Sequence, residues 1–353
     1  MKKQTKQLIV LLVILAVCIV GYLAVTQILT RQQAELEAQQ SADDITTLSG
    51  QVTQITKTAA GEELTFLYDA ETGWSYTDPV FPTAQDNLEE LADLIAPLSP
   101  ERVMTAEESL DAYGLDQPAY TFTAQDDQGN SLTVQVGDAN SNGDFYAIVN
   151  GDESTIYSLD PALVNILAMG LLEFMELPEL PGLSESDLIS VTLEAAGDAP
   201  VTITKETVPA EEEGAADTYL WYLDGTPVDQ LTPSQDFLDA LEARGEDPAD
   251  AATLLEDLLS ALSRMRVTAC ADYSDPQRSL LHGNGAREDD PVPLTATIQY
   301  TDDEDAAQTL TIYLGGQWTE DTDYYLAMFD DDPAVYPIFY NMAEPLYYFA
   351  AAF

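Results

Sequence analysis

The most strongly apolar stretch of the chain lies near its N-terminus. Residues 8–29 form a run of 22 residues without a charged side chain. A helix of this length crosses the roughly 30 Å hydrocarbon core of a bilayer. Lys2, Lys3 and Lys6 precede the run and Arg31 follows it, which favours a cytoplasmic N-terminus. The pattern predicts a single-pass cell-membrane protein that contacts the lipid bilayer through residues 8–29, with an extracytoplasmic ectodomain.

Two other interpretations of this apolar segment stay open. A cleaved signal peptide has a shorter apolar core, about 7–15 residues, followed by a small-x-small site. Here the run is longer and no such site follows it. The segment 15–18 loosely resembles a lipoprotein processing site, but Val17 stands where a small residue is required. We therefore expect an uncleaved anchor in which Cys18 is apolar filler.

Beyond a polar stretch at 31–50, the hydrophobic pattern alternates between strand and helix periodicity. In the first half, strand-like runs surround one amphipathic helix with apolar residues on a single face. The predicted strands cover 52–58, 63–68, 120–124, 132–136 and 145–149, and the predicted helix covers 88–98. Thr83 and Asp86, three residues apart, predict a capping box at the start of this helix.

The second half repeats the order of these landmarks. Strand-like runs recur at 189–193, 201–205, 294–300 and 310–314, around a leucine-rich helix at 254–262. Trp221 follows the second run as Trp74 does in the first half, and Arg266-Val267 follows the helix as Arg102-Val103 does. Tyr146 and Tyr325 are 179 positions apart, as are Tyr157 and Tyr336. This order predicts an internal repeat.

These elements predict an α+β fold with mainly antiparallel sheets, because short turns separate most strands. Asp160 and Pro161 are a suitable N-cap and first residue for a helix, and the apolar run 162–175 is expected to be buried. The prolines of 177–183 would then end that helix. The predicted organisation is a cytoplasmic stub and anchor at 1–30, a stalk at 31–50, a first unit at 51–176, a linker at 177–188, and a second, diverged unit at 189–353.

Composition removes several function classes. The chain has 63 Asp and Glu against 12 Lys and Arg, a formal net charge of −51, which excludes nucleic acid as a partner held by phosphate neutralisation. One His and two Cys cannot build a His/Cys zinc site or an iron–sulfur cluster. Cys270 is alone in the ectodomain, so we expect a free thiol.

Catalytic motifs are scarce. His282 lies in a Gly/Asn-rich turn, a setting typical of an exposed and inert imidazole, and its pairing with Cys270 is a weak nucleophile–base alternative. Paired carboxylates for glycoside hydrolysis arise by chance among 63 acidic residues. The chain is therefore expected to be non-enzymatic and to need no cofactor, with a carboxylate-dependent hydrolase as the alternative.

One segment resembles the start of a calcium loop. It has oxygen-bearing side chains at alternate positions and a glycine, Gly143, at the sixth. The twelfth position is Val149, where a bidentate Glu is needed, so a hairpin turn is the favoured interpretation and weak calcium binding the alternative. The candidate calcium ligands are Asp138, Asn140, Asn142 and Asp144.

The last 30 residues are rich in aromatic side chains. We expect them to form the core and closing helix of the second unit, while a sugar- or protein-binding face is the alternative. Pro337 and Pro345 imply that any helix here is short or kinked. The ten aromatics are Tyr324, Tyr325, Phe329, Tyr336, Phe339, Tyr340, Tyr347, Tyr348, Phe349 and Phe353.

Several segments of the first half resemble a known family. Downstream of the anchor come Gly73–Tyr76, Tyr113–Pro118 (YGLDQP), Leu132–Asp138 and the runs 145–149 and 156–157. In this order they resemble the DUF4340 family of membrane-anchored bacterial proteins of unknown function, best over residues 52–175. The second half lacks a Tyr-Gly-Leu-x-x-Pro segment. The resemblance carries no catalytic residues.

The resemblance also implies a partner. Members of the family are similar to accessory components that accompany ABC-type transporters of the gliding-motility kind. We therefore expect a non-enzymatic accessory or scaffolding component of a membrane complex, with a membrane protein as partner. The alternative is a cell-surface module that binds glycan or peptide.

Overall fold

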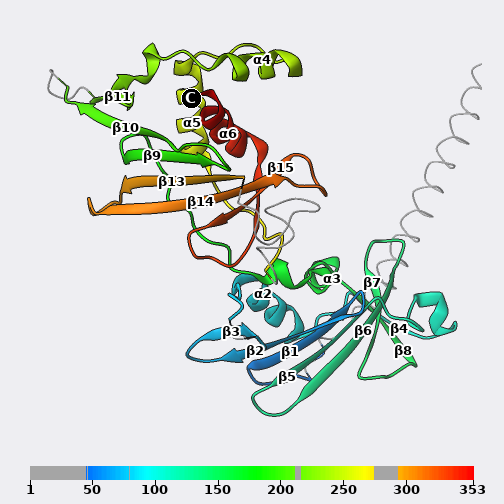
Figure 1. Cartoon of the computed structure of the whole chain (residues 1–353). Helices are drawn as coiled ribbons and strands as arrows, with labels where there is room; N and C mark the ends of the chain where they lie inside the picture. The colour runs from blue at the N-terminus through cyan, green and yellow to red at the C-terminus, as the bar shows by residue number, and fades with distance from the viewer. Residues whose placement is uncertain (1–44, 46, 79, 211–215, 274–292) are drawn as a thin grey trace, which may run out of the picture. The chain divides into compact units, whose positions relative to one another are not determined.

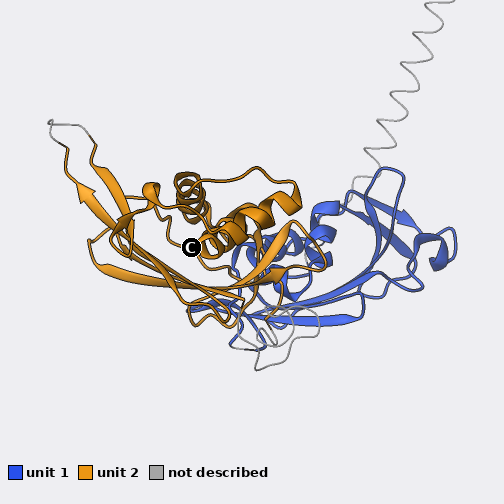
Figure 2. Ribbon diagram, turned by 45° about the horizontal axis from the view of Figure 1, so that its top comes forward, with its two compact units in different colours: residues 1–174 blue, residues 175–353 orange. Residues whose placement is uncertain are grey.

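A computed structural model describes residues 45, 47–78, 80–210, 216–273 and 293–353. The predicted anchor at 8–29 and most of the predicted stalk at 31–50 lie outside the described residues. None of the helices that the structure describes is long and apolar enough to cross a membrane. The chain divides into two compact units, residues 1–174 and 175–353, which Figure 2 shows in blue and orange.

Unit 1 is built on an eight-stranded antiparallel sheet (Figure 1). Its strand order is β3-β2-β1-β5-β6-β7-β8-β4. The strands are β1 (Val52–Ala59), β2 (Glu62–Asp69), β3 (Gly73–Tyr76), β4 (Arg102–Thr105), β5 (Tyr120–Asp126), β6 (Ser131–Ala139), β7 (Phe145–Val149) and β8 (Thr155–Leu159). The helices are α2 (Asp86–Ile95) and α3 (Pro161–Ala168), with 3-10 turns η1 (Leu110–Tyr113) and η2 (Leu171–Phe174).

Unit 2 contains a second eight-stranded antiparallel sheet, in the order β12-β11-β10-β9-β13-β14-β15-β16. Its strands are β9 (Leu188–Ala195), β10 (Val201–Val208), β11 (Thr218–Leu223), β12 (Thr226–Pro227), β13 (Leu294–Thr301), β14 (Ala307–Gln317), β15 (Tyr324–Phe329) and β16 (Tyr336–Phe339). The helical elements are η3 (Val228–Gln230), α4 (Gln235–Arg244), α5 (Ala251–Arg264) and α6 (Tyr340–Ala352). The predicted α+β class with antiparallel sheets is confirmed.

Seven strands follow the same order in both sheets: β3-β2-β1-β5-β6-β7-β8 in unit 1 and β11-β10-β9-β13-β14-β15-β16 in unit 2. Trp74 in β3 and Trp221 in β11 therefore lie on corresponding strands of the two sheets. The eighth strand differs, because β4 pairs with β8 whereas β12 pairs with β11. No strand begins at Arg266; in the described part of unit 2, an isolated bridge between Asp272 and Val335 lies directly before β16.

The pairing register refines the alignment of the two halves by one residue. A β-bulge interrupts β6–β7, after which Ala139 pairs with Phe145. A bulge also interrupts β14–β15, after which Gln317 pairs with Tyr325. The structural counterpart of Tyr325 is thus Phe145 rather than Tyr146. The constant sequence offset missed this shift, because the connection between the bulge and β15 is two residues longer than the corresponding connection before β7. An alignment that is wrong by one residue assigns side chains to the opposite face of the strand.

Each sheet buries one face beneath helices. In unit 1, α3 contacts β1, β5 and α2, and in unit 2, α6 contacts β9, β15, α4 and α5. Apolar side chains such as Ile55 and Val134 point to this face, as period-2 alternation requires. The opposite face carries threonines whose hydroxyls meet across strands, as Thr56 and Thr65 do at 3.0 Å.

The buried face of unit 1 also holds a charged side chain. Lys57 in β1 is 1% exposed, and its Nζ donates to the carbonyls of Leu167, at 2.9 Å, and Met169. The ammonium also lies 5.4 Å from the centroid of the Phe174 ring. A cation at the last carbonyls of a helix stabilises the helix end, so Lys57 ties α3 to the sheet.

Three sequence expectations concern helix ends. Asp160 caps α3 as predicted, with its carboxylate accepting from the Ala162 amide at 2.6 Å. The capping box at Thr83 is wrong: its hydroxyl accepts instead from the Tyr76 amide of β3 at 3.0 Å, and α2 begins only at Asp86. Helix α6 runs for 13 residues through Pro345, so this proline does not shorten it.

Candidate functional site

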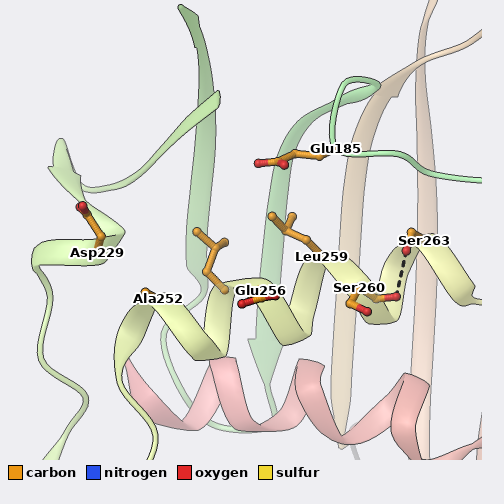
Figure 3. A pocket seen from close by; sticks show the side chains of 8 residues that line it. Glu185, Asp229, Ala252, Glu256, Leu259, Ser260 and Ser263 are labelled. Atoms are coloured by element: carbon orange, nitrogen blue, oxygen red, sulfur yellow. Dashed lines mark hydrogen bonds between the residues drawn. The ribbon is translucent and has the colours of Figure 1, made fainter. Parts of the chain in front are cut away.

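Unit 2 carries a groove of about 480 Å³ along one side of α5 (Figure 3). Six lining residues belong to α5 and recur at helical spacing, so they share one face. The other two come from the loop before β9 and from η3. The lining residues are Glu185, Asp229, Ala252, Leu255, Glu256, Leu259, Ser260 and Ser263.

Helix α5 is amphipathic in a way that creates this groove. Its N-cap is Asp250, whose carboxylate accepts from the Thr253 amide at 2.8 Å. A stripe containing Leu258 is fully buried, and α6 packs against α5. Leu255 and Leu259 lie beside this stripe and are only half-buried. They form an apolar floor that solvent can reach.

One rim of the groove is held in place by two side chains of the sheet. The indole Nε1 of Trp221 donates to the Glu185 carboxylate at 2.9 Å. The Nζ of Lys205 donates to the backbone carbonyl of Glu185 at 2.8 Å and to that of Ser186. Trp221 is buried, so its ring is a rigid support for the carboxylate. Glu185 is thereby preorganised beside α5.

The charged side chains that line the groove are all acidic. Glu185, Asp229 and Glu256 bring three carboxylates, and none of the eight lining residues, all of them described, is basic. The nearby Lys205 is occupied by backbone carbonyls, and burial lowers its pKa, while the charges of Glu185 and Asp187 partly offset this effect. The groove therefore favours a ligand that combines positive charge with apolar surface.

The Ser263 hydroxyl of the groove bonds to the helix backbone. Ser263 Oγ donates to the carbonyl of Ser260 at 2.9 Å (Figure 3). No His, Cys or Lys occurs among the eight described lining residues to activate either hydroxyl. Apolar surface framed by carboxylates is the chemistry of a binding site, and an extended groove of this kind suits a protein segment.

A smaller pocket of about 230 Å³ lies between α5 and α6. The Tyr348 hydroxyl donates to Glu246 at 3.1 Å, and the Arg244 guanidinium lies 5.1 Å from the centroid of the Tyr348 ring. Burial, followed by the charge of Glu344, raises the pKa of Tyr348 to about 12. Burial is also the main reason why the pKa of Glu344 is raised. The pocket is lined by Leu254, Asp257, Arg264, Tyr340, Asn341, Glu344, Pro345 and Tyr348.

The candidate calcium segment forms the hairpin connection between β6 and β7. The Asn140 carboxamide oxygen accepts from the amides of Asn142, at 2.8 Å, and Asp144, at 3.2 Å. Its Nδ2 donates to the Asp144 carboxylate at 3.2 Å, and Gly143 has a φ of +98°, which a turn tolerates in glycine. Within the described residues, no group of three or more His, Cys, Asp or Glu is placed to hold a metal ion. Calcium binding by Asp138, Asn140, Asn142 and Asp144 stays a prediction.

The candidate nucleophile is a free thiol. Burial raises the pKa of Cys270 to about 11, and its sulfur contacts the carbonyls of Asp272 and Val335. A thiol with a raised pKa is a poor nucleophile at neutral pH. His282 lies outside the described residues, so the alternative of a Cys270–His282 pair stays open.

Most C-terminal aromatics belong to the interior of unit 2. Phe329, Tyr336 and Phe349 are buried, and six others are half-buried. The Tyr336 hydroxyl donates to Asp332 at 2.7 Å, and the Tyr347 hydroxyl donates to the Gly315 carbonyl at 2.7 Å. Their packing agrees with the expected core. Tyr340 alone among the ten is exposed.

Sequence reasoning did not identify the groove. Glu185 fell within the predicted linker, and Leu255 and Leu259 were grouped with the leucines of the core face. A helical wheel separates the two leucines from the stripe of Leu254 and Leu258, and this signal was available. Whether the second stripe meets a neighbouring element or solvent is a long-range question that the wheel cannot answer.

A comparison with known protein families identifies the family of this chain. A model of the domain of unknown function DUF4340 matches residues 74–282. The match begins in β3 of unit 1 and continues past α5 of unit 2. It covers 74–175 of the 52–175 segment that resembles the family best and extends about a hundred residues further into the second half. No curated protein and no solved structure matches the chain.

Proposed function

This chain belongs to the DUF4340 family, and from that premise we propose that it is a non-enzymatic, membrane-anchored extracytoplasmic protein that assists a membrane complex, such as an ABC-type transporter. In this proposal residues 8–29 anchor the chain and the N-terminus is cytoplasmic. The α5 groove is the contact with the partner.

The groove is the observation that carries the proposal. It combines the half-buried floor of Leu255 and Leu259 with a carboxylate, Glu185, that Trp221 holds in position. Such a surface would accept a segment whose side chains have apolar stems and cationic ends, as Lys and Arg do. The apolar run at 8–29 supports a location beside membrane proteins.

Site-specific photo-cross-linking in intact cells tests the proposal. A photoreactive amino acid is placed at Leu259 in the full-length, tagged chain, and the control carries it at Thr204. Thr204 is an exposed residue of the same unit, on the face of the sheet away from the helices. We expect a membrane-protein adduct, such as a permease subunit, from position 259 and none from position 204.

Charge reversal sharpens this test. Glu256→Arg should reduce the yield of the adduct, whereas Glu242→Arg on the exposed surface of α4 makes the same change of charge away from the groove and should not. Recovery of the chain alone, or equal adducts from both positions, would refute the proposal. Recovery of cell-wall fragments would favour the second candidate, a glycan- or peptide-binding module.

A further inference from the structure

Tyr340 is the one exposed aromatic side chain within the described residues, with 41% of its surface accessible. It is the first residue of α6 and lies at the edge of the α5–α6 pocket. Its ring packs against Phe339, with centroids 4.8 Å apart. Tyr348, eight residues further along α6, brings a second aromatic ring to the pocket. Exposed aromatic surface beside a cavity is typical of a ligand contact.

Polar groups of several kinds surround these rings. Asp257 and Arg264 come from α5, and Asn341 and Glu344 come from α6. The lining therefore offers a guanidinium, a carboxamide and two carboxyl groups within about 230 Å³.

We propose that the α5–α6 pocket binds one pyranose ring of an uncharged glycan, with the Tyr340 ring against the C–H face of the sugar. A pyranose has an apolar C–H face and a rim of hydroxyls, each of which donates and accepts hydrogen bonds. An aromatic ring flanked by planar donors and acceptors complements both parts. The volume is below the roughly 300–1,000 Å³ of pockets for drug-sized ligands, which suits a single ring.

The charge of the pocket sets its selectivity. The lining contains two carboxyl groups and one guanidinium, and the chain as a whole has a formal net charge of −51. An acidic sugar would be repelled. The site does not rest on the proposed function, because Leu254, Asp257 and Arg264 project from a different side of α5 than the groove residues do.

Binding of neutral trisaccharides to the full-length protein tests this inference. The protein is held in phospholipid nanodiscs, because alkyl-glycoside detergents carry the candidate ligand. Maltotriose, cellotriose and tri-N-acetylchitotriose are titrated by calorimetry, with glucuronic acid as the acidic probe. Tyr340→Ala removes the ring, Tyr340→Phe retains it, and Leu220→Ala changes another residue of unit 2 that is 41% exposed.

We expect at least one neutral trisaccharide to bind saturably and glucuronic acid to bind more weakly. Tyr340→Ala should raise the Kd up to about tenfold, since an aromatic contact contributes about 0.5–1.5 kcal/mol. Tyr340→Phe and Leu220→Ala should leave the Kd within about twofold. The inference is overturned if no trisaccharide binds below about 10 mM, or if Tyr340→Ala binds as the parent does. Binding of trilysine in place of the sugars would also overturn it.

Discussion

Lys57 offers the sharpest test of how unit 1 is held together. Its ammonium bonds the carbonyls of Leu167 and Met169 while its stem lies in the core. Lys57→Met removes the ammonium and keeps most of the stem. Lys57→Ala removes both. The two variants therefore separate the hydrogen bonds from the packing.

The structure sets the expected size of each effect. The Leu167 residue is buried, so its carbonyl would lose its bond to the ammonium and stay out of water, at a cost of about 1–3 kcal/mol. Met169 is half-buried, and water can replace the ammonium there. We expect Lys57→Met to lower the free energy of unfolding by about 1–3 kcal/mol. Lys57→Ala should lose a further 2 kcal/mol or so, because about three methylene-sized groups leave the core.

The assay is urea unfolding combined with hydrogen exchange of the α3 amides, which reports on this helix alone. Lys205→Met is the matched control, because Lys205 also donates to two backbone carbonyls but from a half-exposed position. It should change stability by less than about 1 kcal/mol. If Lys57→Met is as stable as the parent, with α3 equally protected, the ammonium does not stabilise the end of α3.

The pH dependence of the stability difference between the parent and Lys57→Met gives an independent check. Burial lowers the pKa of Lys57 from its ordinary value of 10.5, while the charges of Glu62 and Glu173 partly offset the effect. Between the lowered pKa and 10.5, the unfolded chain binds more protons than the folded chain. The parent should therefore gain stability relative to Lys57→Met as the pH rises through that window. A constant difference would contradict the lowered pKa.

Three further predictions concern unit 2 and the β6–β7 hairpin. Above pH 10 the protein should lose stability, because burial raises the pKa of Tyr348 to about 12 and also raises the pKa of Tyr347. The unfolded chain then releases these protons at a lower pH than the folded chain does. Urea midpoints at pH 10 and 12 test this prediction, and equal midpoints would refute it. Trp221→Phe should cost about 1–2 kcal/mol in urea unfolding and reduce cross-linking from Leu259, because Glu185 loses its indole donor; undiminished cross-linking would show that this support is dispensable. Millimolar calcium should leave the melting temperature unchanged, because the Asn140 oxygen already accepts two amides, and a clear upward shift would instead restore the calcium alternative.

Local pattern accounts for much of the architecture. Alternation over runs such as 52–58 and 132–136 predicted strands that the structure places at 52–59 and 131–139, because the two faces of a strand meet different surroundings. The Asp160 N-cap could also be predicted from local sequence, because its carboxylate accepts from an amide only two residues away. The capping box at Thr83 is wrong because a threonine hydroxyl can accept a hydrogen bond from an amide of a helix or of a strand. Here it accepts from the Tyr76 amide of β3.

The candidate site was much less accessible to such reasoning. Glu185 and Leu259 are 74 positions apart in the chain and meet only because the loop before β9 returns to α5. Tyr340 is one of ten C-terminal aromatics, and nothing in its sequence neighbourhood separates it from the nine that are buried or half-buried. Exposure depends on neighbours from distant parts of the chain.

The sequence by itself determined the α+β class, most strands, the helices near 88–98 and 254–262, the negative net charge and the family, because each follows from local periodicity, composition or short motifs. It did not predict α4. Only the tertiary structure decided which half-buried leucines form a groove floor, which carboxylate stands beside them, and which tyrosine is left in solvent. Those outcomes depend on how elements distant in the chain pack, and packing is a property of the whole unit rather than of any segment.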